Sequence, residues 1–176
     1  MKRLISIVGA GLFISLVGML EPVSAYNEIQ LNKFLALGGG CSNCDLSGAD
    51  LRGELLPERD LANADLTGAD LTEVVLRWAV LNKANLTRAD LTRADLRSAT
   101  IIGADLTEAD LTETVLRWAV LNKANLTGAD LTGADLTEAT LNKANLTGAD
   151  LTGADLTEAT LNKANLTGVD LTDAMM

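Results

Sequence analysis

The sequence contains no histidine, and only 3% of its residues are aromatic. Without histidine, the chain lacks the side chain that most often acts as an acid or base at neutral pH and most often binds metals. It shows neither a nucleophile beside a base nor a glycine-rich phosphate loop, so it predicts no enzyme, no catalytic residue, no metal site and no cofactor. Because aromatic residues are scarce while 48% of residues are hydrophobic, any core must be aliphatic, built mostly from leucine and alanine.

Residues 1–25 have the features of a signal peptide. Lys2 and Arg3 precede an uncharged, mostly apolar run over residues 4–20, and Val23-Ser24-Ala25 fits a small-residue cleavage site. A retained membrane anchor is the alternative, but the run is short for a span and contains three glycines. Cleavage leaves 12 basic and 23 acidic side chains, which changes the net charge from −10 to −11. We expect an exported acidic protein that repels nucleic acid and does not stay inserted in a membrane.

Leucine recurs at every fifth position from Leu46 to Leu171, with Ile101 as the only substitute. The residue two positions before each leucine is usually alanine. On an α-helix, leucines spaced by five would spiral around the axis, and on a strand they would alternate between its two faces. The chain must therefore bend once per repeat, and the glycine, asparagine and aspartate between the leucines suit such turns.

A 20-residue period is superimposed on the five-residue period. Residues 121–140 are repeated without change as residues 141–160, and segment 71–96 matches segment 111–136 with three differences. A 20-residue period means four bends per circuit, so each bend is about a quarter turn. We therefore expect residues 20 apart to stack on one another.

The pattern A(D/N)LXX, as in residues 129–133, resembles the pentapeptide-repeat family over about residues 44–174. The resemblance implies an all-β fold, a right-handed quadrilateral β-helix in which each central leucine and the alanine before it point inward. The start at residues 41–46 after a short helix resembles exported cyanobacterial members, which implies the periplasm or the thylakoid lumen. The predicted organisation is a signal peptide at 1–25, a capping helix within 26–40 and a solenoid at 41–176.

The two ends of the solenoid differ in sequence. Residues 27–37 predict a short helix that covers the first coil, because Asn27 can cap it, apolar residues line one side, and residues 38–40 are glycines that end it. Nothing similar follows Leu171. We therefore expect end-to-end pairing into a homodimer at the C-terminal end, or a partner that covers this end. The alternative is that Met175 and Met176 fold over the last coil.

Glu54 and Arg59 stand at positions where inward-pointing alanine belongs, and Pro57 lies between them. A charge in a narrow core is costly. The sequence therefore predicts a bulged loop at residues 53–60, which is either a binding loop or a degenerate early coil.

Cys41 and Cys44 form a CxxC motif. A turn can bring residues three apart within bridging distance, and export permits a disulfide. Zinc would need two further ligands, and a redox motif would need a thioredoxin-like context that is absent. We expect a structural disulfide or packed thiols.

Stacking at 20-residue intervals predicts columns of like residues. Adjacent carboxylates in an aspartate column repel by about 0.9 kcal/mol even in water, so turn hydrogen bonds or divalent cations must offset this. Stacked asparagines can form a hydrogen-bonded ladder. The aspartate column is Asp50, Asp70, Asp90, Asp110, Asp130, Asp150 and Asp170; a lysine column is Lys83, Lys123, Lys143 and Lys163; the asparagines are Asn85, Asn125, Asn145 and Asn165.

A set of large residues at outward positions is the candidate binding site. Tryptophan and arginine are enriched at binding hot spots, and a clustered exposed patch on an acidic rod suggests a protein partner. The alternative is that these side chains only pack on one another. The set is Val75, Arg77, Trp78, Val80, Arg97, Val115, Arg117, Trp118 and Val120.

The leading prediction is therefore a non-enzymatic, exported interaction or scaffolding module whose protein partner is unknown. Some pentapeptide-repeat proteins resemble duplex DNA in shape and charge and bind DNA gyrase, which is the alternative if the protein is cytosolic. Divalent-cation binding by the aspartate column is a further alternative.

Overall fold

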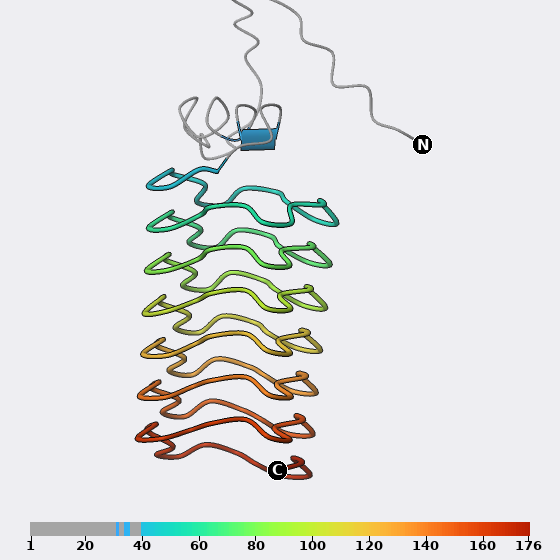
Figure 1. The fold of residues 1–176 in the computed structure, drawn as a ribbon, viewed down its shortest axis with the longest axis vertical. Coiled ribbons are helices and arrows are strands. Elements are labelled where there is room, and N and C mark those ends of the chain that lie inside the picture. Colours follow the sequence, from blue (N-terminus) through green and yellow to red (C-terminus); the bar gives the residue numbers. More distant parts are fainter. Residues whose placement is uncertain (1–30, 32–33, 36–39) are drawn as a thin grey trace, which may run out of the picture.

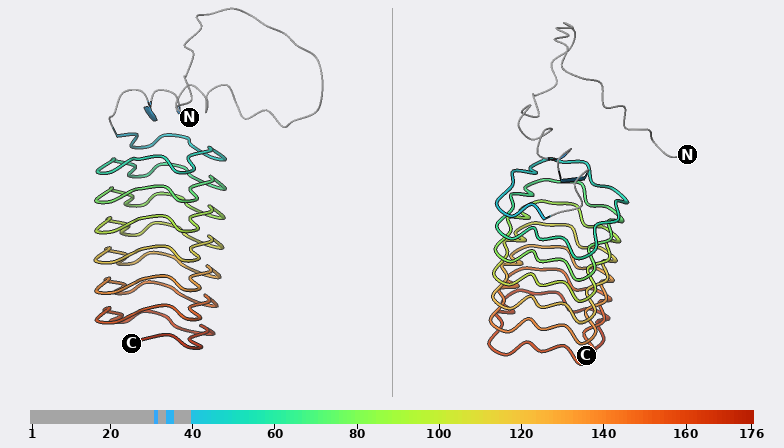
Figure 2. Two further views of the ribbon diagram at one scale, coloured as in Figure 1. Left: turned by 90° about the vertical axis from the view of Figure 1, so that its right-hand side faces the viewer. Right: turned by 45° about the horizontal axis from the view of Figure 1, so that its top comes forward.

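A computed structural model describes residues 31, 34–35 and 40–176 of the chain. From residue 40 onward the chain winds into a rod of stacked coils (Figure 1). Parallel bridges join residues 20 apart throughout, from Asp45–Asp65 to Asp155–Met175. The prediction of four five-residue repeats per coil is confirmed. Two further views show the same stacking from the side and with the N-terminal end tilted forward (Figure 2).

The solenoid contains isolated bridges in place of continuous strands, because each side of a coil is only one repeat long. Each bridged residue lies next to a central leucine, and the leucine N–H donates to the coil that follows, as from Leu46 to the carbonyl of Asp65 at 2.7 Å. The bridged residues themselves donate to the coil before, as from Asp65 to the carbonyl of Cys44 at 2.8 Å. Backbone pairing between neighbouring coils thus satisfies polar groups that would otherwise be left unpaired.

Every repeat has a turn of one kind. In nearly every repeat, the N–H three residues after the central leucine donates to the leucine carbonyl, as from Ala49 to Leu46 at 3.1 Å. The residue two after the central leucine or Ile101 has positive φ at every repeat, and it is glycine at nine positions and another residue at 17. Asn43, two after Cys41, is the eighteenth non-glycine residue with positive φ. Positive φ at the third residue of a turn is the mark of a type II turn. None of the 18 is β-branched, because branching at Cβ makes this conformation costly.

The core is a column of aliphatic side chains. The central leucines from Leu46 to Leu156 are buried, and so are most alanines two positions before them. Burial of one leucine contributes about 1.5–3 kcal/mol, so the repeated leucines drive the winding. In the last coil the column is open, and Leu171 is 38% exposed.

The N-terminal end is described only in part. Leu31, Phe34 and Leu35 are helical, Phe34 is buried in the core, and the two leucines pack against it. The rest of the predicted helix and the whole of residues 1–25 lie outside the described residues, so the cap and the signal peptide stay predictions. Within the described part of the chain, no helix has the length and apolar character needed to cross a membrane.

The predicted bulge at residues 53–60 is wrong. The turn-and-bridge pattern continues there, with Leu55 paired to Val75 and Asp60 paired to Val80. Glu54 and Arg59 are compatible with this pattern because they lie in the first coil. There, side chains at inward positions can leave the core through the end of the solenoid. Glu54 is exposed, and the Arg59 guanidinium lies over the Phe34 ring, 5.5 Å from its centroid. Neither charge is placed in the interior.

Candidate functional site

The nine residues of the predicted patch lie on two adjoining sides of three consecutive coils. Backbone bridges join Val75 to Asp95 and Asp95 to Val115 on one side, and they join Val80 to Thr100 and Thr100 to Val120 on the next. The four valines are half-buried. We call the nine residues the tryptophan–arginine patch.

Trp78 and Trp118 project from the corner between these two sides. Both occupy the positive-φ position of their turns, with φ of 58° and 59°, and they are 57% and 47% exposed. The same position in the coil between them is Ser98, with φ of 57°. Because the three backbones adopt the same conformation, the two indoles start from equivalent points two coils apart.

Arg77 and Arg97 of the patch are held by a carboxylate that was not predicted from the sequence. Asp95 Oδ2 accepts from Arg77 Nε at 2.5 Å and from Arg97 Nη2 at 2.6 Å, and Oδ1 accepts from Arg97 Nε at 2.9 Å. Burial raises the pKa of Asp95, but the hydrogen bonds from Arg97 and Arg77 outweigh it, so the pKa lies below its usual range. Asp95 is therefore ionised at neutral pH and holds two guanidinium groups. Because Asp95 lies 20 residues after Val75, the 20-residue period could have placed it in the patch.

Arg117 is positioned by a different pair of contacts. Its Nη1 lies 3.6 Å from Asp135 Oδ2, and its guanidinium lies over the ring of Trp118, 5.1 Å from the centroid. A guanidinium over an aromatic face is attracted by the ring quadrupole. This contact orients both side chains at the surface.

Two further exposed apolar residues extend the same two sides of the rod. Leu55 is 71% exposed, one coil before Val75, and Ile102 is 38% exposed on the side that carries Thr100. Neither residue was predicted from the sequence. The signal was a second aliphatic residue beside the central one, as in Leu55-Leu56 and Ile101-Ile102.

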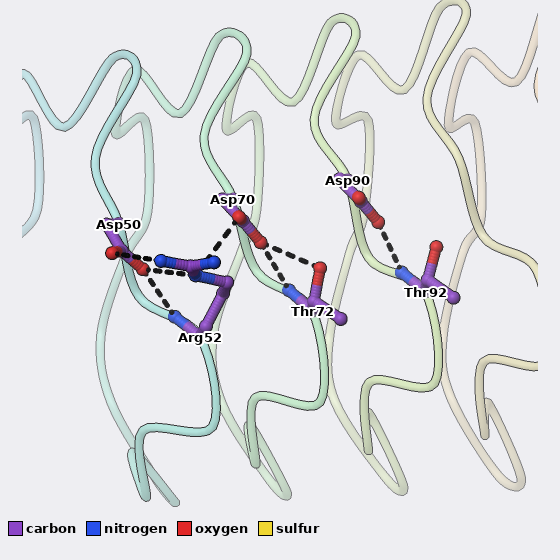
Figure 3. A network of polar contacts seen from close by, with 6 residues as sticks. All are labelled: Asp50, Arg52, Asp70, Thr72, Asp90 and Thr92. Atoms are coloured by element: carbon purple, nitrogen blue, oxygen red, sulfur yellow. Dashed lines mark hydrogen bonds and ion pairs between the residues drawn. The ribbon is translucent and has the colours of Figure 1, made fainter.

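The aspartates of the column accept hydrogen bonds from residues of their own turns (Figure 3). Asp70 Oδ1 accepts from the Thr72 N–H at 3.1 Å and from its hydroxyl at 2.7 Å, and Asp90 Oδ1 accepts from the Thr92 N–H at 2.9 Å. Burial raises the pKa of Asp90, but hydrogen bonds from Thr92 and Thr72 outweigh it and lower the pKa overall. These bonds offset repulsion, which favours the turn interpretation over cation binding. Among residues 40–176 and the described residues before them, no three acidic or cysteine side chains gather as a metal site would require.

Asparagines form ladders along the rod. In the predicted ladder, Asn125 Nδ2 donates to Asp105, Asn145 to Asn125, and Asn165 to Asn145, each at 3.2 Å. A second ladder was not predicted, in which the backbone N–H of one coil donates to an asparagine of the coil before, as from residue 142 to Asn122 at 2.9 Å. Both are structural contacts between coils.

The two cysteines lie at the start of the solenoid and are joined by a disulfide, with their Cα atoms 5.4 Å apart. The Cys44 N–H donates to the Cys41 carbonyl at 3.2 Å, which closes the turn between them. Beside it, Asp60 accepts from the Ser42 hydroxyl at 2.7 Å. The hydrogen bonds from Ser42 and from the Ala62 N–H lower the pKa of Asp60.

Known proteins similar to the chain share this architecture. The model for pentapeptide repeats matches residues 60–97, 101–137 and 134–173, in eight copies. HetL from the cyanobacterium Nostoc, a pentapeptide repeat protein involved in heterocyst differentiation regulation, is 34% identical; the alignment covers 77% of this chain and 73% of HetL, with a TM-score of 0.64.

Two other solved structures are more distant. QnrB1, a plasmid-mediated fluoroquinolone resistance protein, is 24% identical over 75% of this chain and 78% of its own, with a TM-score of 0.42. A pentapeptide repeat protein from the Arabidopsis thaliana thylakoid lumen is 26% identical over 79% of this chain and 69% of its own, with a TM-score of 0.35. No curated protein matches the sequence at a significant level.

Proposed function

Because the chain belongs to the pentapeptide-repeat family, whose members are right-handed β-helices, we propose that it is a non-enzymatic interaction module that binds a protein through the tryptophan–arginine patch. The rod supplies a rigid scaffold, and the patch supplies the residue types that dominate binding energies at interfaces.

One observation supports this proposal most strongly. Trp78 and Trp118 are the only tryptophans in the sequence, and both stand exposed at the same corner of the rod. The arginines between and beside them are already held by Asp95 and Asp135. Side chains fixed before binding lose little conformational freedom when a partner docks, which favours affinity.

We also propose that the protein is exported, with residues 1–25 removed. The support is the basic start, the apolar run and the small residues before Tyr26. Mass spectrometry of the protein isolated from cells tests this, and a first residue of Tyr26 is expected. Uncleaved protein in the cytosol would contradict export and would favour the DNA-mimic alternative.

The interaction proposal is tested by cross-linking and affinity capture of the mature form from periplasmic and lumenal extracts, with mass spectrometry of the captured proteins. The test variant is Trp78→Ala with Trp118→Ala. The control is Glu138→Ala with Glu158→Ala, because these residues occupy the same positive-φ turn position in two coils outside the patch. Circular dichroism should show that both variants keep the fold.

We expect the tryptophan variant to lose a protein that the unaltered chain and the glutamate variant both capture. Equal capture by the folded tryptophan variant would contradict the proposal, since the exposed indoles would then make no contact with the partner.

A further inference from the structure

We infer, resting on the proposed function, that the tryptophan–arginine patch binds an acidic, proline-containing peptide that runs along the rod axis in the polyproline II conformation. Charge and spacing are the two observations behind it.

The patch lies on a basic region of an acidic protein. Segments 74–83, 94–103 and 114–123 form two sides of three consecutive coils, and together they hold five basic side chains and one acidic side chain. The rest of the chain after Ala25 holds seven basic and 22 acidic side chains. The equivalent segments of other coils, 54–63, 134–143 and 154–163, are each net negative. The basic region thus coincides with the exposed tryptophans, and an anionic partner would be steered to it.

The arginines retain capacity to bind further carboxylates. Arg77 and Arg97 share the single carboxylate of Asp95, whose side chain is only 14% exposed. A guanidinium has five N–H donors, and Arg77 donates one of them to Asp95. The three patch arginines are each 37–40% exposed, so a carboxylate from solution can reach them. Because Asp95 and Asp135 already orient these side chains, a partner would meet fixed guanidinium groups.

The spacing of the indoles indicates the conformation of the peptide. Neighbouring coils pair through backbone bridges, so Trp78 and Trp118 are about 9.6 Å apart along the rod axis, which is twice the usual strand spacing. A polyproline II helix repeats every three residues, or about 9.3 Å, with no internal hydrogen bonds. Residues i and i+3 of such a peptide would therefore meet the two indoles in register. The small side chain of Ser98 lies between the indoles at the same turn position.

Proline at these two contact positions fits the surface best. Proline-rich segments dock on aromatic surfaces with little loss of entropy, because their conformation exists before binding. Acidic residues between the prolines would point toward the arginines on one side or toward Lys83 and Lys123 on the other. A peptide of repeating Pro-Glu-Glu combines both features.

The test uses the intrinsic fluorescence of the purified protein, because both tryptophans of the sequence belong to the patch. The probe is the peptide (Pro-Glu-Glu)4, and the comparison peptides are (Gly-Glu-Glu)4 and (Pro-Gln-Gln)4. We expect a saturable change of the emission with (Pro-Glu-Glu)4, weaker binding of the glycine peptide and no saturable change with the glutamine peptide. The affinity should fall about tenfold when salt is raised from about 50 to 500 mM.

Variants with matched charge changes locate the site, with calorimetry as the readout. Arg77→Gln with Arg97→Gln should weaken binding about tenfold, whereas Arg88→Gln with Arg93→Gln should not, because Arg88 and Arg93 pair with Glu108 and Glu73 outside the patch. A second pair of variants changes lysines only, so that Asp95 keeps its contacts with Arg77 and Arg97. Lys83→Gln with Lys123→Gln should weaken binding several-fold, and Lys143→Gln with Lys163→Gln should leave it unchanged.

The absence of a saturable signal with (Pro-Glu-Glu)4, equal binding of the glycine peptide, or equal losses in the matched variants would each overturn the inference. These failures are distinguishable from failure of the proposed function. If the tryptophan variant still loses its captured protein while the peptide does not bind, the patch is an interface for a partner of other chemistry.

Discussion

At the scale of single residues, the position within the repeat decides what a side chain can do. Thr114 stands at an inward alanine position and is fully buried, yet its hydroxyl donates to the Leu91 carbonyl at 2.8 Å. Thr140 stands at a bridged position below Val120, and its hydroxyl is the one buried side-chain oxygen or nitrogen with no hydrogen bond partner in the described part of the chain. A buried hydroxyl without a partner loses its hydration and gains nothing in return.

Thr140→Val should therefore stabilise the protein by about 1 kcal/mol, because the methyl group replaces an unsatisfied hydroxyl of similar size. The matched control is Thr160→Val, since Thr160 pairs with Thr140 in the next coil but is exposed. Unfolding in urea gives the free energy of unfolding of both variants. A loss of stability in Thr140→Val would show that its hydroxyl has a partner in solution.

At the scale of the element, one coil and its neighbours form the structural unit. Aspartates before the central leucines accept hydrogen bonds from the residue two positions later, and at Asp90, Asp155 and Asp170 these bonds favour the ionised form. The pKa values of Asp60, Asp90, Asp95, Asp155 and Asp170 lie below the usual range. The columns of like charge are thus stabilised by contacts within each turn.

These lowered pKa values predict how stability depends on pH. A carboxylate whose pKa is lower in the folded state stabilises the fold fully above its unfolded pKa of about 3.9, and that stabilisation is lost as the pH falls through the folded pKa. The free energy of unfolding should therefore fall on acidification below about pH 4. Asp95→Asn should lose less stability between about pH 5 and pH 2 than the unaltered protein. An equal loss in both would contradict the role assigned to Asp95.

The sequence predicted the coil well and its exceptions poorly. The five-residue leucine period indicated the aliphatic core, because a single buried column satisfies that spacing, and the 20-residue period indicated four repeats per coil. The expected bulge at residues 53–60 was wrong, since the penalty for charge at Glu54 and Arg59 applies only inside the stack. The 20-residue register could have placed Asp95 beside the patch, but its ion pairs and the ladder through Asn122 were missed, because the register alone does not give side-chain contacts between coils.

At the scale of the whole molecule, the rod is a one-dimensional stack in which each coil contacts only its neighbours. The stability of such proteins is close to a sum of repeat and interface contributions. The identical segments 121–140 and 141–160 therefore make coils that are interchangeable in position.

Deletion of residues 141–160 should leave a folded, shorter rod with lower thermal stability. The cut joins Thr140 to Leu161, which restores the sequence found at Thr140-Leu141. Deletion of residues 141–158 is the control, because it breaks the five-residue leucine spacing. Circular dichroism and thermal unfolding show whether each deletion variant is folded and how stable it is. An unfolded product of the first deletion, or a native-like product of the second, would contradict the model of stacked repeats.

We also propose that the open last coil pairs with a second copy of the chain. Leu171 and Met175 are exposed there, and the exposed edge of a stack favours pairing with another chain. Light scattering should show a mass that rises toward a dimer with concentration, and Leu171→Asp with Met175→Asp should abolish the rise. Leu55→Asp, which alters an exposed leucine in the first coil, is the control. A monomeric mass at high concentration would end this proposal.

The tryptophan–arginine patch exists only if residues 20 apart lie one above another, and a distance measurement tests this stacking most directly. Spin labels placed by Lys83→Cys with Lys123→Cys, and by Lys83→Cys with Lys163→Cys, probe one column over two coils and four coils. Labelling without reduction preserves the Cys41–Cys44 disulfide. We predict axial separations of about 10 Å and about 19 Å, the second twice the first. Separations that do not scale with the number of coils would contradict the stacked solenoid and, with it, the patch.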